Sequence, residues 1–254
     1  MKRMTLQDFF KETPKAALAF SGGVDSAYLL YAAHQCGADV RPYYVKSVFQ
    51  PQFELDDALR LARQLGMPLT VLEVDVLANE TVRANPQNRC YFCKQRIFSR
   101  IGAAAASDGY SVVLDGTNAS DDASDRPGMR ALAELEVRSP LRLCGLTKAE
   151  IRRRSKEAGL FTWDKPSYAC LATRIPTGTP LDEKTLSAVE QAEDGLMALG
   201  FRNVRARVEQ GAIRLELLPE QIAYAEQNWD NVTNCIQKAF PNTQIFVKVR
   251  QNVT

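Results

Sequence analysis

The segment Ser21–Ser26, with the sequence SGGVDS, contains the groups that hold an anion. An apolar run predicted as a strand ends at Phe20, and a helical pattern follows the segment. Glycines in a strand-to-helix turn let the backbone approach a ligand closely, and the first N–H groups of the helix can bind phosphate. The hydroxyls of Ser21 and Ser26 add donors, and Asp25 can orient a magnesium ion or the loop. There is no G-x-x-x-x-G-K-[ST] pattern, so we do not expect a loop that transfers a terminal phosphate.

A second candidate for chemistry is Cys170, within the segment Lys165–Gly178. Prolines near both ends of this segment prevent a long helix, so Cys170 is expected on a constrained loop. Lys165 and Arg174 flank it, and a nearby positive charge favours the thiolate, which is the reactive form of cysteine. The alternative, which cysteine statistics alone favour, is a buried residue that acts as a small apolar side chain.

Two further cysteines, Cys90 and Cys93, form a C-x-x-C pair. In a helix this spacing places both sulfurs on one face, where they can share a metal ion or form a disulfide. A structural zinc site needs four ligands, and the chain has no second C-x-x-C pair. Thiolates from Cys90, Cys93 and Cys170 would instead suit a [4Fe–4S] cluster with one iron left open.

A G-T-N turn follows the predicted strand Ser111–Leu114. Because ligands bind at the carboxyl ends of parallel strands, this turn is expected to face the same crevice as Ser21–Ser26. Three aspartates follow this turn: Asp121, Asp122 and Asp125. They could hold magnesium, although a solvated loop is the better interpretation of Asp121 and Asp122. The predicted nucleotide-binding residues are Ser21, Gly22, Gly23, Asp25, Ser26, Gly116 and Thr117.

Arg205 and Arg207 lie two apart on a predicted strand, so both side chains are expected on one face. Two guanidinium groups on one face can hold one phosphate. From spacing alone, a solvated charged face is the favoured explanation. The same choice applies to Glu216 on the partner strand and to Glu190 and Glu193 on the preceding helix.

Composition limits the classes of protein that fit. The 254 residues carry a net charge of +2, which gives no bulk attraction to nucleic acid. No apolar run approaches the ~20 residues of a membrane span, and the N-terminus does not resemble a signal peptide. We therefore expect a cytoplasmic protein with reduced cysteines. His34 is the only histidine, which argues against Ser-His-Asp and Cys-His catalysis.

The elements that position these residues alternate between strand and helix over the first two thirds of the chain. Predicted strands cover 16–20, 40–48, 69–76 and 111–114, and predicted helices cover 54–65, 90–106 and 147–158. This alternation predicts an α/β fold with a doubly wound, mostly parallel sheet.

The pattern changes after Pro180. Helices are predicted over 181–199 and 219–240, a hairpin over 203–209 and 212–217, and a last strand over 243–249. We therefore predict three parts: an ATP-binding domain over 1–165, a cysteine-bearing active-site linker over 166–180, and a small α+β substrate or oligomerisation domain over 181–254. We expect a homo-oligomer.

These motifs resemble the PP-loop of the ATP pyrophosphatase superfamily and, taken together, the LarE family of ATP-dependent sulfur transferases. The resemblance spans nearly the whole chain, and its most specific part is the stretch PSYACLATRIP around Cys170. It implies that ATP, with Mg²⁺, adenylates a carboxylate of a pyridinium dicarboxylate mononucleotide, and that sulfur then attacks the activated acyl carbon. The product would serve the synthesis of a nickel-pincer cofactor.

By the same resemblance, Cys170 matches the sulfur-delivering cysteine. Arg174, Arg205 and Arg207 match positions that hold the substrate phosphate, and acidic site residues are expected at Asp125, Glu193 and Glu216. Two routes exist in such proteins: loss of the cysteine's own sulfur, which leaves dehydroalanine, or transfer of a sulfide from a [4Fe–4S] cluster. The presence of Cys90 and Cys93 favours the cluster route. One departure is Val208–Gly211, where a histidine or another basic residue is expected.

Three alternatives stay open at this point. A PP-loop amide ligase of the NAD- or GMP-synthetase kind would use Ser21–Ser26 but give Cys170 no role. A tRNA thiolation enzyme would need a basic surface, which the near-neutral charge does not favour. A nucleotide-binding regulator without catalysis would leave the loop cysteine and the arginine pair without a role.

Overall fold

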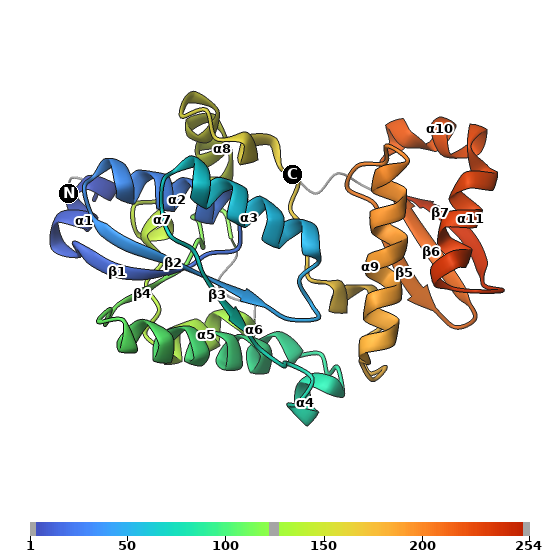
Figure 1. The fold of residues 1–254 in the computed structure, drawn as a ribbon, viewed down its shortest axis with the longest axis horizontal. Coiled ribbons are helices and arrows are strands. Elements are labelled where there is room, and N and C mark those ends of the chain that lie inside the picture. The colour runs from blue at the N-terminus through green and yellow to red at the C-terminus, as the bar shows by residue number, and fades with distance from the viewer. Residues whose placement is uncertain (1–3, 122–126, 251–254) are drawn as a thin grey trace. The chain divides into compact units, whose positions relative to one another are not determined.

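The computed structural model describes residues 4–121 and 127–250. The chain divides into two units (Figure 1). Unit 1 consists of Met1–Val76 and Asn88–Ser167, and unit 2 consists of Leu77–Gln87 and Tyr168–Thr254. The predicted three-part division by function remains a prediction.

Unit 1 is built on a four-stranded parallel sheet. The strands are β1 (Lys15–Ala19), β2 (Asp39–Lys46), β3 (Thr70–Glu73) and β4 (Val113–Leu114), in the order β3-β2-β1-β4. Parallel strands need crossover connections, which the intervening helices provide. The predicted α/β class is confirmed.

Helices cover both faces of this sheet (Figure 1). Alternate residues of β1 point to opposite faces: Leu18 packs with α2 (Val24–Gln35) and α3 (Gln52–Gln64), whereas Ala17 packs with α5 (Arg89–Ser107). The buried β1 side chains are small or aliphatic, which suits a strand covered on both sides. The other helical elements of unit 1 are α1 (Leu6–Glu12), α6 (Pro127–Glu134), α7 (Pro140–Leu143), α8 (Lys148–Glu157) and η1 (Phe161–Asp164).

The first helix, α1, was not expected from the sequence. Thr5 caps it and forms a capping box with Asp8, and the buried Phe9 and Phe10 join the core. Thr147 caps α8 in a similar way, since its hydroxyl accepts from the N–H of Glu150 at 3.3 Å. Both caps satisfy N–H groups that the helix leaves unpaired.

Unit 2 contains a three-stranded sheet in the order β5-β6-β7. β5 (Arg205–Glu209) and β6 (Ala212–Leu217) form the predicted hairpin, and β7 (Gln244–Val249) pairs parallel with β6. The helical elements are α4 (Glu80–Arg83), η2 (Leu171–Arg174), α9 (Glu183–Ala198), η3 (Pro219–Gln221), α10 (Ile222–Gln227) and α11 (Trp229–Ala239). The core packs α9, α10 and α11 on the apolar face of β6.

One predicted element is wrong. The sequence pattern predicts a single helix over 219–240, but the chain forms η3, α10 and α11 and breaks at Asn228. The Asn228 amide donates to the carbonyl of Tyr224 at 2.9 Å, and the Asn228 backbone leaves the helical region at φ −116° and ψ 25°. Asparagine side chains compete with helical backbone hydrogen bonds in this way.

The segment Leu77–Gln87 joins unit 2 although unit 1 precedes and follows it in the chain. The buried Asn85 donates to the carbonyls of Pro176 and Thr179 at 2.9 and 3.1 Å, and its own carbonyl accepts from Gly178. These bonds hold the downstream end of the cysteine-bearing segment. Among the described residues, no helix combines the length and the apolar content needed to cross a membrane.

Candidate functional site

The predicted anion-binding segment connects β1 to α2. Gly22 has φ +70°, a conformation that side chains disfavour, and a Cβ there would lie 3.1 Å from the Cβ of Ala58. The hydroxyls of Ser21 and Ser26 are 3.2 Å apart, and Ser26 Oγ accepts from the N–H of Ser21 and donates to the carbonyl of Gly23. The two serines therefore hold the turn in shape as well as supplying donors.

The N-terminus of α2 has no side-chain cap. Gly23 is the N-cap residue and offers no side chain to cap the helix. The first intrahelical bond runs from Ala27 N–H to the Gly23 carbonyl at 3.0 Å. The N–H groups of Val24, Asp25 and Ser26 precede that bond, and such groups, together with the helix dipole, bind phosphates.

The predicted G-T-N turn lies against the same helix end. A Cβ on Gly116 would lie 2.9 Å from the backbone nitrogen of Ser26, so only glycine fits there without a shift. The buried Asn118 amide donates to Asp25 at 3.4 Å. The structure thus brings the predicted nucleotide-binding residues of the two segments together at the carboxyl ends of β1 and β4.

The hydroxyl of Thr117 is used within its own turn, where it donates to Asp115. Asp115 is buried and also accepts from Ser139 Oγ at 2.6 Å. Asp121 accepts from the N–H of Asn118 at 3.0 Å, which supports the interpretation of a structural loop residue. Asp122 and Asp125 lie outside the described residues.

Asp25 pairs with Lys148, whose Nζ lies 2.5 Å from Asp25 Oδ2. Burial raises the pKa of Asp25 above its ordinary value, and the charge of Lys148 offsets part of this rise. Sequence analysis missed Lys148, which is the first residue of α8. A cation at the positive end of a helix opposes the helix dipole, and this unfavourable placement was the available signal.

Cys90 and Cys93 lie in the first turn of α5, with Cys90 exposed and Cys93 half-buried. Their one-turn spacing suits two ligands to a single metal centre. Cys170 belongs to unit 2. The part of the chain that the structure describes contains no group of three His, Cys, Asp or Glu side chains that could hold a metal ion.

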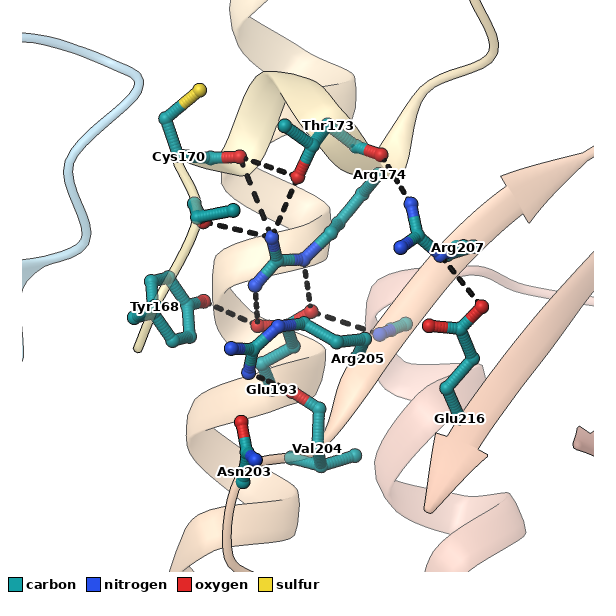
Figure 2. A network of polar contacts seen from close by, with 12 residues as sticks. Tyr168, Cys170, Thr173, Arg174, Glu193, Asn203, Val204, Arg205, Arg207 and Glu216 are labelled. Atoms are coloured by element: carbon teal, nitrogen blue, oxygen red, sulfur yellow. Dashed lines mark hydrogen bonds and ion pairs between the residues drawn. The ribbon is translucent and has the colours of Figure 1, made fainter. Parts of the chain in front are cut away.

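Cys170 precedes η2 in unit 2, and a buried charged network surrounds its backbone (Figure 2). Arg174 Nη1 donates to the carbonyl of Ala169 at 2.8 Å and to that of Cys170 at 3.4 Å. Its Nε donates to Glu193 Oε1 at 2.7 Å and its Nη2 to Glu193 Oε2 at 3.0 Å. Both side chains are 1% exposed or less. Removing one member of such a buried pair costs about 3–5 kcal/mol.

The carboxylate of Glu193 has two further donors. Its Oε2 accepts from the hydroxyl of Tyr168, and its Oε1 accepts from the N–H of Ala206 at 2.8 Å. Burial, and then the charge of Glu193, raise the pKa of Tyr168, so this hydroxyl stays protonated. Burial lowers the pKa of Arg174, but the hydrogen bond and charge of Glu193 outweigh it and raise that pKa.

The two arginines predicted on β5 have different environments. Arg205 is 2% exposed, lies over the ring of Tyr168 at 4.3 Å and donates to the carbonyl of Val204. Burial, and then the charge of Arg174, lower the pKa of Arg205 to about 10. Arg207 is half-exposed and donates to Glu216 at 2.7 Å and to the carbonyl of Thr173 at 2.6 Å.

The C-terminal end of β7 brings another arginine, Arg250, into the same electrostatic environment. Its Nη1 donates to the carbonyl and the side-chain oxygen of Asn203. Burial lowers the pKa of Arg250, Glu216 raises it, and the charges of Arg174 and Arg207 lower it further. Such crowding of cations favours a bound anion.

Lys165 Nζ lies 2.7 Å from Asp57 Oδ2, so the charge expected beside Cys170 is paired with a carboxylate of unit 1. His34, the only histidine in the chain, is exposed in the last turn of α2.

The comparisons with known proteins assign the chain to a family. It is 33% identical over 218 residues to the pyridinium-3,5-bisthiocarboxylic acid mononucleotide synthase of Lactiplantibacillus plantarum. The matched region covers 85% of this chain and 79% of that enzyme. The chain belongs to the LarE family. It is also 38% identical over 222 residues to an uncharacterized protein of Synechocystis sp., covering 87% of this chain and 83% of that protein. No protein-family model matches it.

More distant matches extend the relationship to the PP-loop enzymes. The chain is 28% identical over 126 residues to the tRNA-specific 2-thiouridylase of Fervidobacterium nodosum, covering 40% of this chain and 36% of that enzyme. The LarE-family chain is therefore an ATP-using sulfurtransferase of the PP-loop type. The amide-ligase and tRNA-thiolation alternatives are not favoured.

Proposed function

We propose that this LarE-family chain adenylates a carboxylate of a pyridinium dicarboxylate mononucleotide and converts it to a thiocarboxylate for nickel-pincer cofactor synthesis. The observation that carries the proposal is the 33% identity over 85% of the chain to an enzyme named for the bisthiocarboxylic acid mononucleotide. A carboxylate oxygen is a poor leaving group, and attachment of AMP makes it a good one. Sulfur can then attack the acyl carbon.

ATP binding is assigned to unit 1. The N–H groups that begin α2, with the hydroxyls of Ser21 and Ser26, would hold the leaving pyrophosphate. Mg²⁺ usually takes one or two carboxylates together with substrate phosphates, and the buried Asp25 is suited to be such a carboxylate. Lys148 would then release Asp25 and neutralise a phosphate oxygen.

Substrate binding is assigned to the arginines of unit 2. Five arginines of its described residues interact with three carboxylates: Arg174, Arg205, Arg207, Arg214 and Arg250 with Glu193, Glu209 and Glu216. Five positive charges against three negative charges leave an excess that a phosphate dianion can balance. The half-exposed Arg207 and the buried Arg205 are the phosphate ligands we propose, with Glu216 orienting Arg207. The acidic role predicted for Asp125 stays a prediction.

Sulfur delivery is assigned to Cys170. In the sacrificial route its thiolate attacks the acyl-adenylate, a C–S bond forms and AMP leaves. Removal of the Cys170 α-proton then breaks its Cβ–S bond, the electron pair stays on sulfur, and the thiocarboxylate departs. Dehydroalanine remains in the chain.

The cluster route uses Cys90 and Cys93 in addition to Cys170. A [4Fe–4S] cluster with an open iron would supply a sulfide, and the exposed Cys90 and half-buried Cys93 have the spacing for two of its ligands. The two routes differ in the fate of Cys170. Intact-protein mass after one turnover separates them: loss of the elements of hydrogen sulfide indicates sacrifice, whereas unchanged mass with bound iron after anaerobic reconstitution indicates the cluster.

The experiment for the overall function combines the protein with ATP, Mg²⁺ and the pyridinium dicarboxylate mononucleotide. We expect AMP and pyrophosphate in equal amounts, together with a thiocarboxylate. Formation of ADP and inorganic phosphate would contradict the proposal. Omission of the mononucleotide is the control and should abolish AMP formation.

We also propose that the protein is a cytoplasmic homo-oligomer. The described residues include all six cysteines and contain no disulfide, which fits a reducing compartment. β7 is an edge strand with Phe246, Val247 and Val249 exposed, and such a strand is a natural surface for pairing with another copy. Light scattering tests the oligomer, and a monomer at all concentrations would contradict it.

A further inference from the structure

We propose that Arg174 and Glu193 form a positioning device that fixes the backbone on both sides of Cys170 to the strand that carries Arg205 and Arg207. This inference rests on the proposed role of Cys170 in sulfur delivery. It changes the expectation for Arg174, which the sequence resemblance places among the ligands of the substrate phosphate.

The loop side of the device is a set of carbonyl contacts. Arg174 Nη1 donates to Ala169 O at 2.8 Å, to Cys170 O at 3.4 Å and to Thr173 Oγ1 at 2.8 Å. Thr173 Oγ1 in turn donates to Cys170 O at 2.8 Å. The carbonyl of Cys170 faces this network, while its sulfur points away from it (Figure 2). The guanidinium therefore holds the backbone of Cys170 through its carbonyl.

The strand side of the device is the carboxylate of Glu193. One oxygen, Oε1, accepts from Arg174 Nε at 2.7 Å and from the backbone N–H of Ala206 at 2.8 Å. Ala206 lies between Arg205 and Arg207, so this bond fixes the part of β5 from which both arginines project. A second link runs from Arg207 Nη1 to the carbonyl of Thr173 at 2.6 Å. The loop and the strand are thus joined at two points.

The contacts of Arg174 argue against it as a ligand of the substrate, because its guanidinium is bound to both oxygens of Glu193 and to the loop carbonyl of Ala169. Its side chain is 0% exposed and its charge is paired with Glu193. A planar guanidinium offers donors in a fixed fork, which suits the two oxygens of Glu193 and the loop carbonyls together. By comparison, the side chain of Arg207 is 33% exposed. Arg174 therefore acts on the reaction through the position of Cys170.

The first experiment compares two half-reactions in Glu193→Gln and Thr173→Val. AMP and pyrophosphate formation measures adenylation, and thiocarboxylate formation measures sulfur transfer. We expect adenylation to be unchanged in both variants, and the KM for the mononucleotide to be unchanged in Thr173→Val. Sulfur transfer should fall about 100-fold in Glu193→Gln, since misplacement by ~1 Å costs that much. In Thr173→Val, which loses the hydrogen bonds of Thr173 Oγ1 to Cys170 O and Arg174 Nη1, sulfur transfer should fall about tenfold.

The second experiment needs no substrate. Iodoacetamide alkylation of each cysteine is followed by peptide mass spectrometry in the wild type and in both variants. Loss of a hydrogen bond lets the loop open more often, so alkylation of Cys170 should speed up about two- to tenfold. Alkylation of the exposed Cys90 in unit 1 is the internal control and should not change.

Two matched controls make the same substitutions at exposed residues outside the network. Thr177→Val changes an exposed threonine of the same segment, and Glu226→Gln removes an exposed carboxylate of unit 2. Both should behave as the wild type. If Glu193→Gln does not fold, Thr173→Val alone decides.

Unchanged alkylation of Cys170 in Thr173→Val would overturn the inference. A raised KM for the mononucleotide at normal sulfur transfer would also overturn it, because it would make the pair a substrate ligand. Failure of the proposed function looks different: the wild type itself would form no AMP with the mononucleotide, while the alkylation rates would still test the positioning.

Discussion

The two candidate sites of this molecule differ in the groups that set their electrostatics. In unit 1 the candidate anion site consists of backbone N–H groups, hydroxyls and glycines, with Lys148 paired to Asp25. In unit 2 the candidate site contains the buried Arg174, held by Glu193. In the proposed function a pyrophosphate must leave after each reaction, and neutral dipoles bind it without a lasting ion pair. The cysteine loop and the strand proposed to bind phosphate must stay in register, which strong charge-assisted bonds achieve.

The comparison also explains which site the sequence revealed. The loop Ser21–Ser26 is contiguous, and its geometry follows from two glycines between a strand and a helix. The network of unit 2 is assembled from the segment around Cys170, from α9 and from β5, which are separate in the chain. The resemblance to the LarE family indicated its residues, whereas spacing alone favoured a solvated charged face. The roles of Arg174 and Glu193 depend on which backbone groups they contact.

In the fold, too, local sequence patterns predicted some features, whereas others depend on side-chain contacts. The parallel sheet, the hairpin and the helices α2, α3, α5, α8 and α9 followed from hydrophobic periodicity and glycine stops. The break at Asn228 did not, because it depends on a side-chain hydrogen bond to Tyr224. The membership of Leu77–Gln87 in unit 2 depends on contacts of Asn85 with residues about ninety positions away, which no local pattern contains.

The largest effect on the first site should come from Gly22→Ala. A Cβ there would lie 3.1 Å from Ala58, and the misplaced loop should slow adenylation about 100-fold. Gly37→Ala is a matched control, because Gly37 also has φ +70° but meets nothing within 4 Å. Both variants lose about 1–2 kcal/mol of stability to the left-handed conformation. Equal adenylation rates in Gly22→Ala and Gly37→Ala would contradict a role for the close approach of Gly22 to Ala58.

Lys148→Met should have a smaller effect. Loss of a bond between charged groups weakens ATP binding about tenfold. Since Lys148 lowers the pKa of Asp25, its removal should raise that pKa further. As the pH falls, Lys148→Met should therefore lose Mg²⁺·ATP binding at a higher pH than the wild type does. Calorimetric titration across pH measures both effects. Arg153→Met, on the exposed face of the same helix, is the control; equal affinities in the two variants would remove Lys148 from the site.

The smallest effect concerns the stability of unit 2. Inorganic phosphate at 100 times its dissociation constant should stabilise the wild type by about 2.7 kcal/mol. Arg205→Met should abolish this gain. It should not lower stability without phosphate, because burial lowers the pKa of Arg205 and apolar replacement of such a charge is tolerated. Thermal unfolding measures both, with the exposed Arg202→Met as control; a full phosphate shift in Arg205→Met would contradict the assignment.

The most direct test is a single reaction of Cys170→Ser with ATP, Mg²⁺ and the pyridinium dicarboxylate mononucleotide, with the products identified by mass spectrometry. We predict an adenylated mononucleotide, formed at the wild-type rate, and no thiocarboxylate. Thiocarboxylate at the wild-type yield would contradict the assignment of sulfur delivery to Cys170.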